Sequence, residues 1–276
     1  MVATAGYPLV SIITICKNAE KMIEKTMMSV FNQTYPFIEY IIIDGKSDDR
    51  TVSIAKNLAT IHGGDKRTLI ISDYDCGISD AMNKGVLLSK GGLVSHLHAG
   101  DRYVDDCTID KVVNSFLKKK WRWAVAGARV VDALGNQKHH YLPDPALCNL
   151  LKKNSIPHQS TFLVKDIFEK HGLFRTDYAQ AMDYEFWLRI AFKGNEKYTV
   201  LPFDATYFLE GGRSSNITEL LQHLYRLRKM LHEYKCPNNV FLDIIFLTRV
   251  FLFSMYLKAH PLLKPLLNLN RKGRMG

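Results

Sequence analysis

The stretch of the chain from Ser72 to Tyr103 carries carboxylates at Asp75, Asp80 and Asp101. Carboxylate oxygens act as general bases, accept hydrogen bonds and bind hard cations. The apolar run Leu93 to Leu97 predicts a buried strand, and Asp101 follows it. Because open α/β sheets bind ligands outside the carboxyl ends of their strands, we expect Asp101 at the mouth of a binding site.

The segments before this stretch alternate between strand and helix patterns. Leu9 to Asn18 and Glu39 to Asp44 are apolar and rich in β-branched residues, which predicts two buried strands, and Leu69 to Ile71 predicts a third, short strand. Helical periodicity between them is typical of βαβ units and of a parallel sheet. The acidic residues that follow the strands are then expected at one edge of the sheet: Asp44, Asp75 and Asp101.

The turns after the strands exclude two common phosphate-binding sites. No GxGxxG follows the first strand, and no GxxxxGK[ST] occurs in the chain, so the glycine-rich cradle of dinucleotide-binding and P-loop proteins is absent. After the second strand, Gly45 predicts a turn, and we expect Ser47 or Asp48 to cap the next helix. Acidic strand ends suit a divalent cation that bridges to a diphosphate, so a nucleoside diphosphate with a metal ion is the expected ligand.

The composition predicts a globular protein. The chain has 276 residues, of which 47% are hydrophobic, enough for one large domain with an appendage. Its five cysteines include no CxxC pair, which argues against a disulfide framework or a structural zinc site. The beginning of the chain has no signal-like pattern, and we therefore expect a cytoplasmic location.

The net charge of +10 is concentrated in the tail. Leu220 to Gly276 contains ten Lys or Arg residues and two acidic residues. Its apolar segment, Val240 to Lys258, is nearly long enough to span a membrane, but Asp243 and Arg249 would each cost roughly 2.5 to 3.5 kcal/mol at a helix centre. We expect the tail to lie on an anionic membrane surface, with a core helix or a dimer interface as the alternative, and we expect no nucleic acid partner.

Several segments carry a family resemblance. The stretch Ser11 to Thr51 closely resembles the opening of the family 2 inverting glycosyltransferases, which have the GT-A fold. Later segments resemble the subgroup that builds capsule, O-antigen and colanic-acid-type polysaccharides: DCGISDAMNKG, LHAGD, IPHQSTFL and AMDYEFWLRIA. The resemblance covers roughly Leu9 to Gly212 and implies an α/β GT-A domain at residues 1–215, with a mixed sheet flanked by helices. A basic amphipathic helical extension would follow at residues 216–276.

The resemblance also implies a donor site. Asp44 matches the aspartate that binds the nucleotide base, and Thr14 would line the same pocket; a turn-capping aspartate and an ordinary strand threonine are the alternatives. Asp75 matches an acidic position near the ribose and the diphosphate. Asn83 and Lys84 belong to the following helix, where a solvated polar face is the alternative.

Asp101 fits the metal-binding position, although the motif around it is reduced. The family has two acids there, whereas this chain reads His98, Ala99, Gly100, Asp101. One carboxylate, diphosphate oxygens and waters suffice for Mg²⁺ or Mn²⁺. His98 is an alternative nitrogen ligand, but the alternation within VSHLH favours a strand side chain.

Asp183 matches the catalytic base of the family, which removes the proton of the acceptor hydroxyl. It also starts a predicted helix, where an acid is favoured by the helix dipole, and Glu185 is a second candidate. His158, in a His-Gln pair with Gln159, would contact the acceptor or the departing diphosphate, with a structural histidine as the alternative.

Together these features predict inverting transfer of a sugar, from a UDP-linked donor, to a lipid-linked or growing glycan in cell-surface polysaccharide biosynthesis. The protein would lie peripherally on the inner face of the cell membrane. Two alternatives are a sugar-phosphate nucleotidyltransferase and a non-catalytic, membrane-bound partner of a polysaccharide assembly complex. The first usually relies on a glycine-rich basic loop near the N-terminus, which this chain lacks.

Overall fold

The computed structural model describes residues 2–3, 6–62, 67–132, 134–151, 154–178 and 181–209, together with a few residues from 229 to 255. The chain divides into two units, residues 1–213 and 214–276. Most of the basic tail, including most of its apolar segment, lies outside the described residues. Within the described part, every helix is too short or too polar to span a bilayer.

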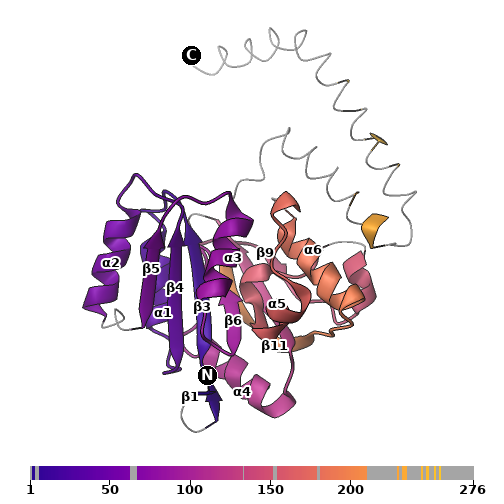
Figure 1. Cartoon of the computed structure of the whole chain (residues 1–276), viewed down its shortest axis with the longest axis horizontal. Coiled ribbons are helices and arrows are strands. Elements are labelled where there is room, and N and C mark those ends of the chain that lie inside the picture. Colours follow the sequence, from indigo (N-terminus) through magenta and orange to yellow (C-terminus); the bar gives the residue numbers. More distant parts are fainter. Residues whose placement is uncertain are drawn as a thin grey trace. The chain divides into compact units, whose positions relative to one another are not determined.

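The first unit is built on a mixed sheet that has nine strands among the described residues (Figure 1). Its strand order is β5-β4-β3-β6-β10-β8-β11-β7, and β9 pairs with β8. The strands of this sheet are β3 (Val10–Cys16), β4 (Ile38–Asp44), β5 (Thr68–Ser72), β6 (Leu93–His96), β7 (Arg102–Tyr103), β8 (Trp123–Val131), β9 (Gln137–Tyr141), β10 (Thr161–Val164) and β11 (Thr199–Leu209). A separate antiparallel pair is formed by β1 (Val2–Ala3) and β2 (Tyr7–Pro8).

One half of the sheet is parallel, as the βαβ pattern predicts. β3 pairs in parallel with β4 and β6, and β4 pairs in parallel with β5. Cys16 lies opposite Asp44 in the register, so β3 and β4 end side by side. β3 is fully buried and mostly apolar, as expected for a central strand. The carboxyl ends of these strands meet at one edge of the sheet.

The other half is mixed. β10 runs antiparallel to both β6 and β8, and β11 runs parallel to β8. The helices of the unit are α1 (Ile23–Phe31), α2 (Thr51–Ile61), α3 (Ile78–Leu88), α4 (Thr108–Lys119), α5 (Asp166–His171) and α6 (Met182–Leu188). Short 3-10 turns occupy Leu147–Leu151, His158–Ser160 and Thr176–Tyr178, and a π turn, Arg189–Lys193, follows α6. The predicted mixed α/β fold is confirmed.

Helix α3 lies close against the parallel half. A Cβ atom on Gly85 would lie 2.3 Å from the Ile13 side chain of β3, so only glycine permits this approach. The apolar face of α1 is buried, with Ile23, Met27 and Val30 in the core. Both helices therefore hold their ends at fixed positions beside the carboxyl edge of the sheet.

The predicted cap of α2 is wrong. The helix begins at Thr51 and no side chain caps it from the N-cap position, Arg50. Asp49 instead accepts a hydrogen bond from the backbone N–H of Thr51 at 2.9 Å, and Ser47 donates to Asp44. Short polar side chains bond to nearby backbone in several patterns, so their spacing did not identify where the helix begins.

Candidate active site

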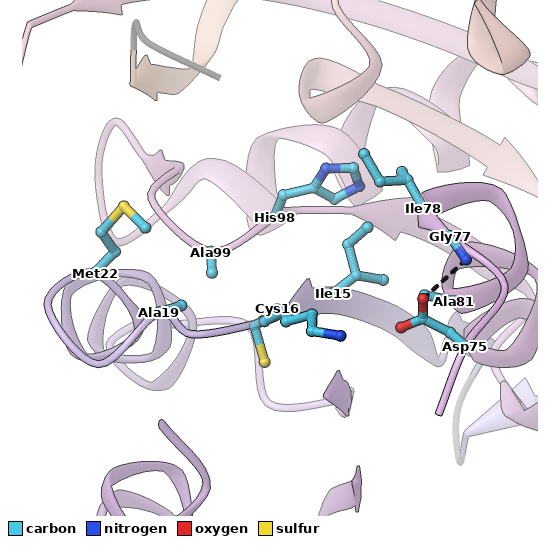
Figure 2. Close-up of a pocket in the computed structure, with 11 residues that line it drawn as sticks. Ile15, Cys16, Ala19, Met22, Asp75, Gly77, Ile78, Ala81, His98 and Ala99 are labelled. Carbon is cyan, nitrogen blue, oxygen red and sulfur yellow. Dashed lines mark hydrogen bonds between the residues drawn. The ribbon is translucent and has the colours of Figure 1, made fainter. Parts of the chain in front are cut away.

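A pocket of about 460 Å³ opens beside the carboxyl ends of β3 and β6 and the beginning of α3. Its lining comes from four segments: Ile15, Cys16, Lys17, Ala19 and Met22; Asp75, Gly77 and Ile78; Ala81; and His98 with Ala99. Asp75 and Met22 lie at opposite sides of the pocket, and His98 lies on the wall between them (Figure 2). The pocket therefore has a polar side, at Asp75, and an apolar side, at Met22.

Asp75 owes its position to two glycines. Its Oδ1 accepts a hydrogen bond from the backbone N–H of Gly77 at 2.9 Å. A Cβ atom on Gly45 would lie 2.4 Å from Asp75 Oδ2 and 3.4 Å from Cδ of Lys17. The bare backbone of Gly45 thus leaves room for both the acid and the lysine.

Lys17 is a pocket residue that the motif analysis missed. It follows the last residue of β3, is exposed, and makes no ion pair with any residue that the structure describes. A free ammonium group at the mouth of this pocket favours an anionic ligand. Its position directly after a buried strand, at the predicted ligand edge, was a signal that could have identified it.

Asp44 and Thr14 are buried in the sheet and do not line this pocket. Asp44 accepts hydrogen bonds from the backbone N–H of Ser47 at 2.9 Å and from the hydroxyl of Ser72 at 2.6 Å. Thr14 donates to the carbonyl of Leu97 at 2.6 Å. These bonds join the ends of neighbouring strands, and the base-binding roles of Asp44 and Thr14 stay predictions.

Asn83 and Lys84 hold the loops around the pocket. The Asn83 amide donates to the Phe174 carbonyl at 2.8 Å and accepts from the Phe174 N–H at 2.9 Å. Lys84 donates to the Tyr74 carbonyl at 2.6 Å and pairs with Asp80 at 3.1 Å. A hydrogen bond from the Cys76 N–H lowers the pKa of Asp80. Both residues therefore have structural partners, and their donor-binding roles stay predictions.

Asp183 and His158 come together as a pair. Asp183 lies in the first turn of α6, and its Oδ2 is 3.8 Å from Nδ1 of His158. The ring of His158 in turn contacts the ring of His98, with 4.6 Å between centroids. Since His98 lines the pocket, His98, His158 and Asp183 form a continuous row from the pocket to the carboxylate. The side chain of Asn154 also approaches Asp183, at 3.4 Å.

The antiparallel pairing of β10 with β6 creates this row. Phe162 of β10 lies opposite Ser95 of β6. The residues before β10 therefore run beside the residues after β6, which brings His158 to His98. Sequence spacing alone gives no sign of this pairing.

Aromatic packing fixes α6 on the sheet. Trp187 stacks on Trp123 of β8 with 5.5 Å between ring centroids, and Phe186 stacks on Phe168 at 5.0 Å. Glu185, the second candidate base, is fully buried and pairs with Arg189 at 2.9 Å. Asp183 is thus the acid of this helix that faces the histidine row.

Asp101 lies beyond the pocket wall, in a turn made possible by Gly100, whose φ is +105°. Its side chain is buried and accepts a hydrogen bond from the Leu209 N–H at 3.2 Å. Burial raises the pKa of Asp101 to about 8, and a nearby cation would favour the ionised form.

The described residues fit a cation held chiefly by substrate oxygens. They contain no group of three or more His, Cys, Asp or Glu side chains arranged to hold a metal ion. Mg²⁺ and Mn²⁺ sites that use one or two carboxylates with substrate phosphates need no such group. Asp101 is buried and does not line the pocket, and its role as that carboxylate stays a prediction.

The pKa values of three histidines near the pocket are lowered, which favours the neutral form. Burial lowers the pKa of His96 to about 3 and the pKa of His98 well below its usual value. Burial also lowers the pKa of His158, an effect that the negative charge of Asp183 opposes. A neutral imidazole has one donor and one acceptor nitrogen.

The parallel half with its pocket and the mixed half with Asp183 define the GT-A class of α/β proteins. Two solved structures have the same fold. S. aureus TarS in complex with UDP gives a TM-score of 0.62 at 14% identity, over 80% of this chain and 64% of that one. The mannosyltransferase PcManGT from Pyrobaculum calidifontis, in complex with GDP-Man and Mn²⁺, gives a TM-score of 0.59 at 18% identity, over 96% of this chain and 81% of that one.

Residues 11–182 match the sequence profile of glycosyl transferase family 2, and the chain belongs to this family. It is 28% identical over 200 residues to a protein of *Haemophilus influenzae* named as an uncharacterized glycosyltransferase. That similarity covers 67% of this chain and 60% of the relative, so the chain matches less than two thirds of the relative's length. The predicted family is confirmed.

Proposed function

We propose that this protein is an inverting glycosyltransferase that moves a sugar from a nucleoside-diphosphate donor to an acceptor hydroxyl, with Asp183 as the base. The observation that carries the proposal is the row of side chains that connects the pocket to Asp183. His98 lines the pocket, His158 contacts His98, and Asp183 lies 3.8 Å from His158. A donor bound in the pocket would place its sugar toward the carboxylate.

The chemistry needs a base on one side of the sugar and a leaving diphosphate on the other. Asp183 would remove the acceptor proton as the acceptor oxygen attacks the anomeric carbon. Lys17 and the backbone around Gly77 would hold the diphosphate in the pocket. A divalent cation held by Asp101 and the diphosphate would stabilise the charge of the leaving group.

The donor is proposed to be UDP-linked, with Asp44 and Thr14 near the base, Asp75 near the ribose, and Asn83 and Lys84 beside the diphosphate. The TarS complex with UDP supports a uridine nucleotide in this fold, whereas the PcManGT complex, with GDP-Man and Mn²⁺, supports a guanosine nucleotide together with a cation. A binding screen of UDP, GDP and dTDP with and without Mn²⁺ distinguishes the donors, because a ligand of the folded state raises the melting temperature.

The acceptor is proposed to be a lipid-linked or growing glycan of the cell surface, met at the inner face of the membrane. The basic, apolar tail at residues 216–276 supports this acceptor class, because a tail on an anionic leaflet keeps the enzyme beside a lipid-linked substrate. Membrane binding of the tail is part of the proposal.

Product analysis tests the reaction class. With a nucleotide sugar and an acceptor, glycosyl transfer releases a nucleoside diphosphate. A nucleotidyltransferase would instead release pyrophosphate from a nucleoside triphosphate, and a non-catalytic partner would release neither. Release of pyrophosphate, or no turnover with any donor in a broad panel, contradicts the proposal.

Asp183→Asn tests the base. We expect transfer to fall by at least about a hundredfold, since general base catalysis contributes roughly 10² to 10⁴ in rate, while donor affinity stays unchanged. Initial rates and calorimetric donor binding measure the two effects separately. Glu169→Gln, at an exposed acid on α5, is the control and should keep both rate and affinity. An active Asp183→Asn enzyme removes Asp183 as the base.

A further inference from the structure

Three histidines beside the active site have a ring nitrogen that is buried and unpaired. Nε2 of His96, His98 and His158 has no hydrogen-bond partner among the residues that the structure describes. Leaving a buried polar atom unpaired costs about 1–3 kcal/mol. Most such atoms in folded proteins are paired, so each unpaired atom needs an explanation.

Two of the three histidines lie between the two ends of the proposed reaction. His98 lines the pocket, and His158 lies between His98 and Asp183. His96 differs: it is almost fully buried, packs against Phe174 and bonds to the backbone of Met82. It does not line the pocket.

With Asp183 as the base, the transferred sugar would occupy this same space. In an inverting transfer the anomeric carbon lies between the leaving diphosphate and the base, so the sugar ring spans from the phosphates to Asp183. The side chains along that path are His98 and His158. A sugar hydroxyl both donates and accepts, which matches the one donor and one acceptor of a neutral imidazole.

We propose that His98 and His158 form the sugar subsite of the donor pocket, in which their unpaired Nε2 atoms bond to hydroxyl groups of the transferred sugar. This proposal rests on the proposed function and adds the residues that select the sugar. His98 would act as a sugar-contacting residue of this subsite. A site built to bond to a hydroxyl discriminates strongly against a ligand that lacks it, because its buried polar atoms are then left unpaired.

The test compares a nucleotide with its own nucleotide sugar. Binding constants are measured by calorimetry with Mn²⁺ for UDP, UDP-glucose, UDP-galactose, UDP-N-acetylglucosamine, GDP and GDP-mannose. The readout is the ratio of the dissociation constant of the diphosphate to that of its sugar conjugate. This ratio isolates the sugar, because contacts to the base, ribose and phosphates are shared.

His98→Phe keeps a ring of similar size and removes both nitrogens. We expect the ratio for the preferred sugar to fall about tenfold, while UDP or GDP affinity changes less than twofold. His158→Phe should also lower this ratio. His98→Gln places an amide nitrogen near the original Nε2 and should restore most of the ratio, which also guards against a folding defect of the phenylalanine variant.

His96→Phe is the matched control, because it makes the same chemical change at a buried histidine outside the pocket. It should leave the ratio unchanged. A uniform loss of affinity for diphosphate and sugar conjugate in His98→Phe overturns the proposal, as does an unchanged ratio. If the wild-type protein binds no nucleotide or nucleotide sugar, the proposed function itself fails, and that outcome is distinct from the first two.

Discussion

At the scale of single residues, the pocket places a carboxylate, Asp75, and a lysine, Lys17, around Gly45. Gly45 has no side chain, and the space is shared by Asp75 Oδ2 and the stem of Lys17. Asp75 is fixed by the Gly77 N–H, whereas Lys17 makes no ion pair within the described part of the chain. A fixed acid suits a ribose hydroxyl, and a free cation suits phosphate oxygens.

Lys17→Gln is therefore expected to weaken UDP binding about tenfold, because hydrogen bonds to charged groups contribute about 1.5–3 kcal/mol. Uridine, which lacks phosphates, should bind the variant and the wild type equally. Calorimetry with both ligands measures the difference. Lys46→Gln is the control, because Lys46 lies 3.9 Å over the Tyr74 ring and does not line the pocket. Equal weakening of uridine and UDP would contradict a phosphate contact.

Asp101→Ala is expected to remove the effect of Mn²⁺ on UDP binding, because Asp101 is the proposed carboxylate ligand. In the wild type, added Mn²⁺ should tighten UDP binding; in the variant the two titrations should coincide. Asp106→Ala, an exposed acid a few residues further on, should behave like the wild type. A variant that keeps the full manganese effect rules Asp101 out as the ligand.

At the scale of elements, the site depends on turns that end the strands. The turn after β6 passes through Gly100 at a φ of +105° and brings Asp101 to the backbone of Leu209 in β11. A Cβ atom on Gly100 would lie 3.3 Å from the Leu209 side chain. Both the backbone conformation and the close packing therefore favour glycine.

Gly100→Ala should lower the free energy of unfolding by about 1–3 kcal/mol, since a non-glycine residue is strained at such a positive φ. Chemical denaturation measures this loss. Gly92→Ala is the matched control: a Cβ there meets no atom within 4 Å, and its φ is not positive. It should leave stability nearly unchanged or slightly raised, because alanine restricts the unfolded chain. Equal stabilities of the two variants would contradict the strain argument.

At the scale of the whole molecule, the two units carry different charge. The net charge of +10 comes mostly from the tail, while the first unit carries the pocket and the candidate base. Juxtamembrane basic residues contribute about 1 kcal/mol each to binding of an anionic leaflet. Membrane association of this protein is therefore expected to depend on tail charge.

Replacing Arg271, Lys272 and Arg274 with Gln in the full chain should reduce binding to vesicles that contain phosphatidylserine by roughly a hundredfold. Cosedimentation with vesicles measures binding, and vesicles of phosphatidylcholine alone should bind neither protein strongly. Replacing the exposed Lys118, Lys119 and Lys120 at the end of α4 is the control for charge alone. Equal losses in the two triple variants would contradict a specific role of the tail.

The sequence by itself determined the strands of the parallel half of the sheet and the family. Parallel strands are continuous apolar runs, and helices between them show their own period, so the buried strands β3, β4 and β6 and the more exposed β5 were predictable from local pattern. The position of Asp183 in the first turn of a helix was predictable for the same reason. The residue that caps α2 was not predictable from the sequence, because neighbouring polar side chains compete for the same backbone groups.

Only the tertiary structure decided which of these residues meet. The antiparallel entry of β10 beside β6 joins His98 to His158, and the stacking of Trp187 on Trp123 places Asp183 at the end of that row. Both are contacts between segments far apart in the chain, and no local period encodes them. The surroundings of Asp44 and Thr14 were also decided by the tertiary structure. A strand pattern shows that a side chain is buried, but it does not show which pocket the side chain faces.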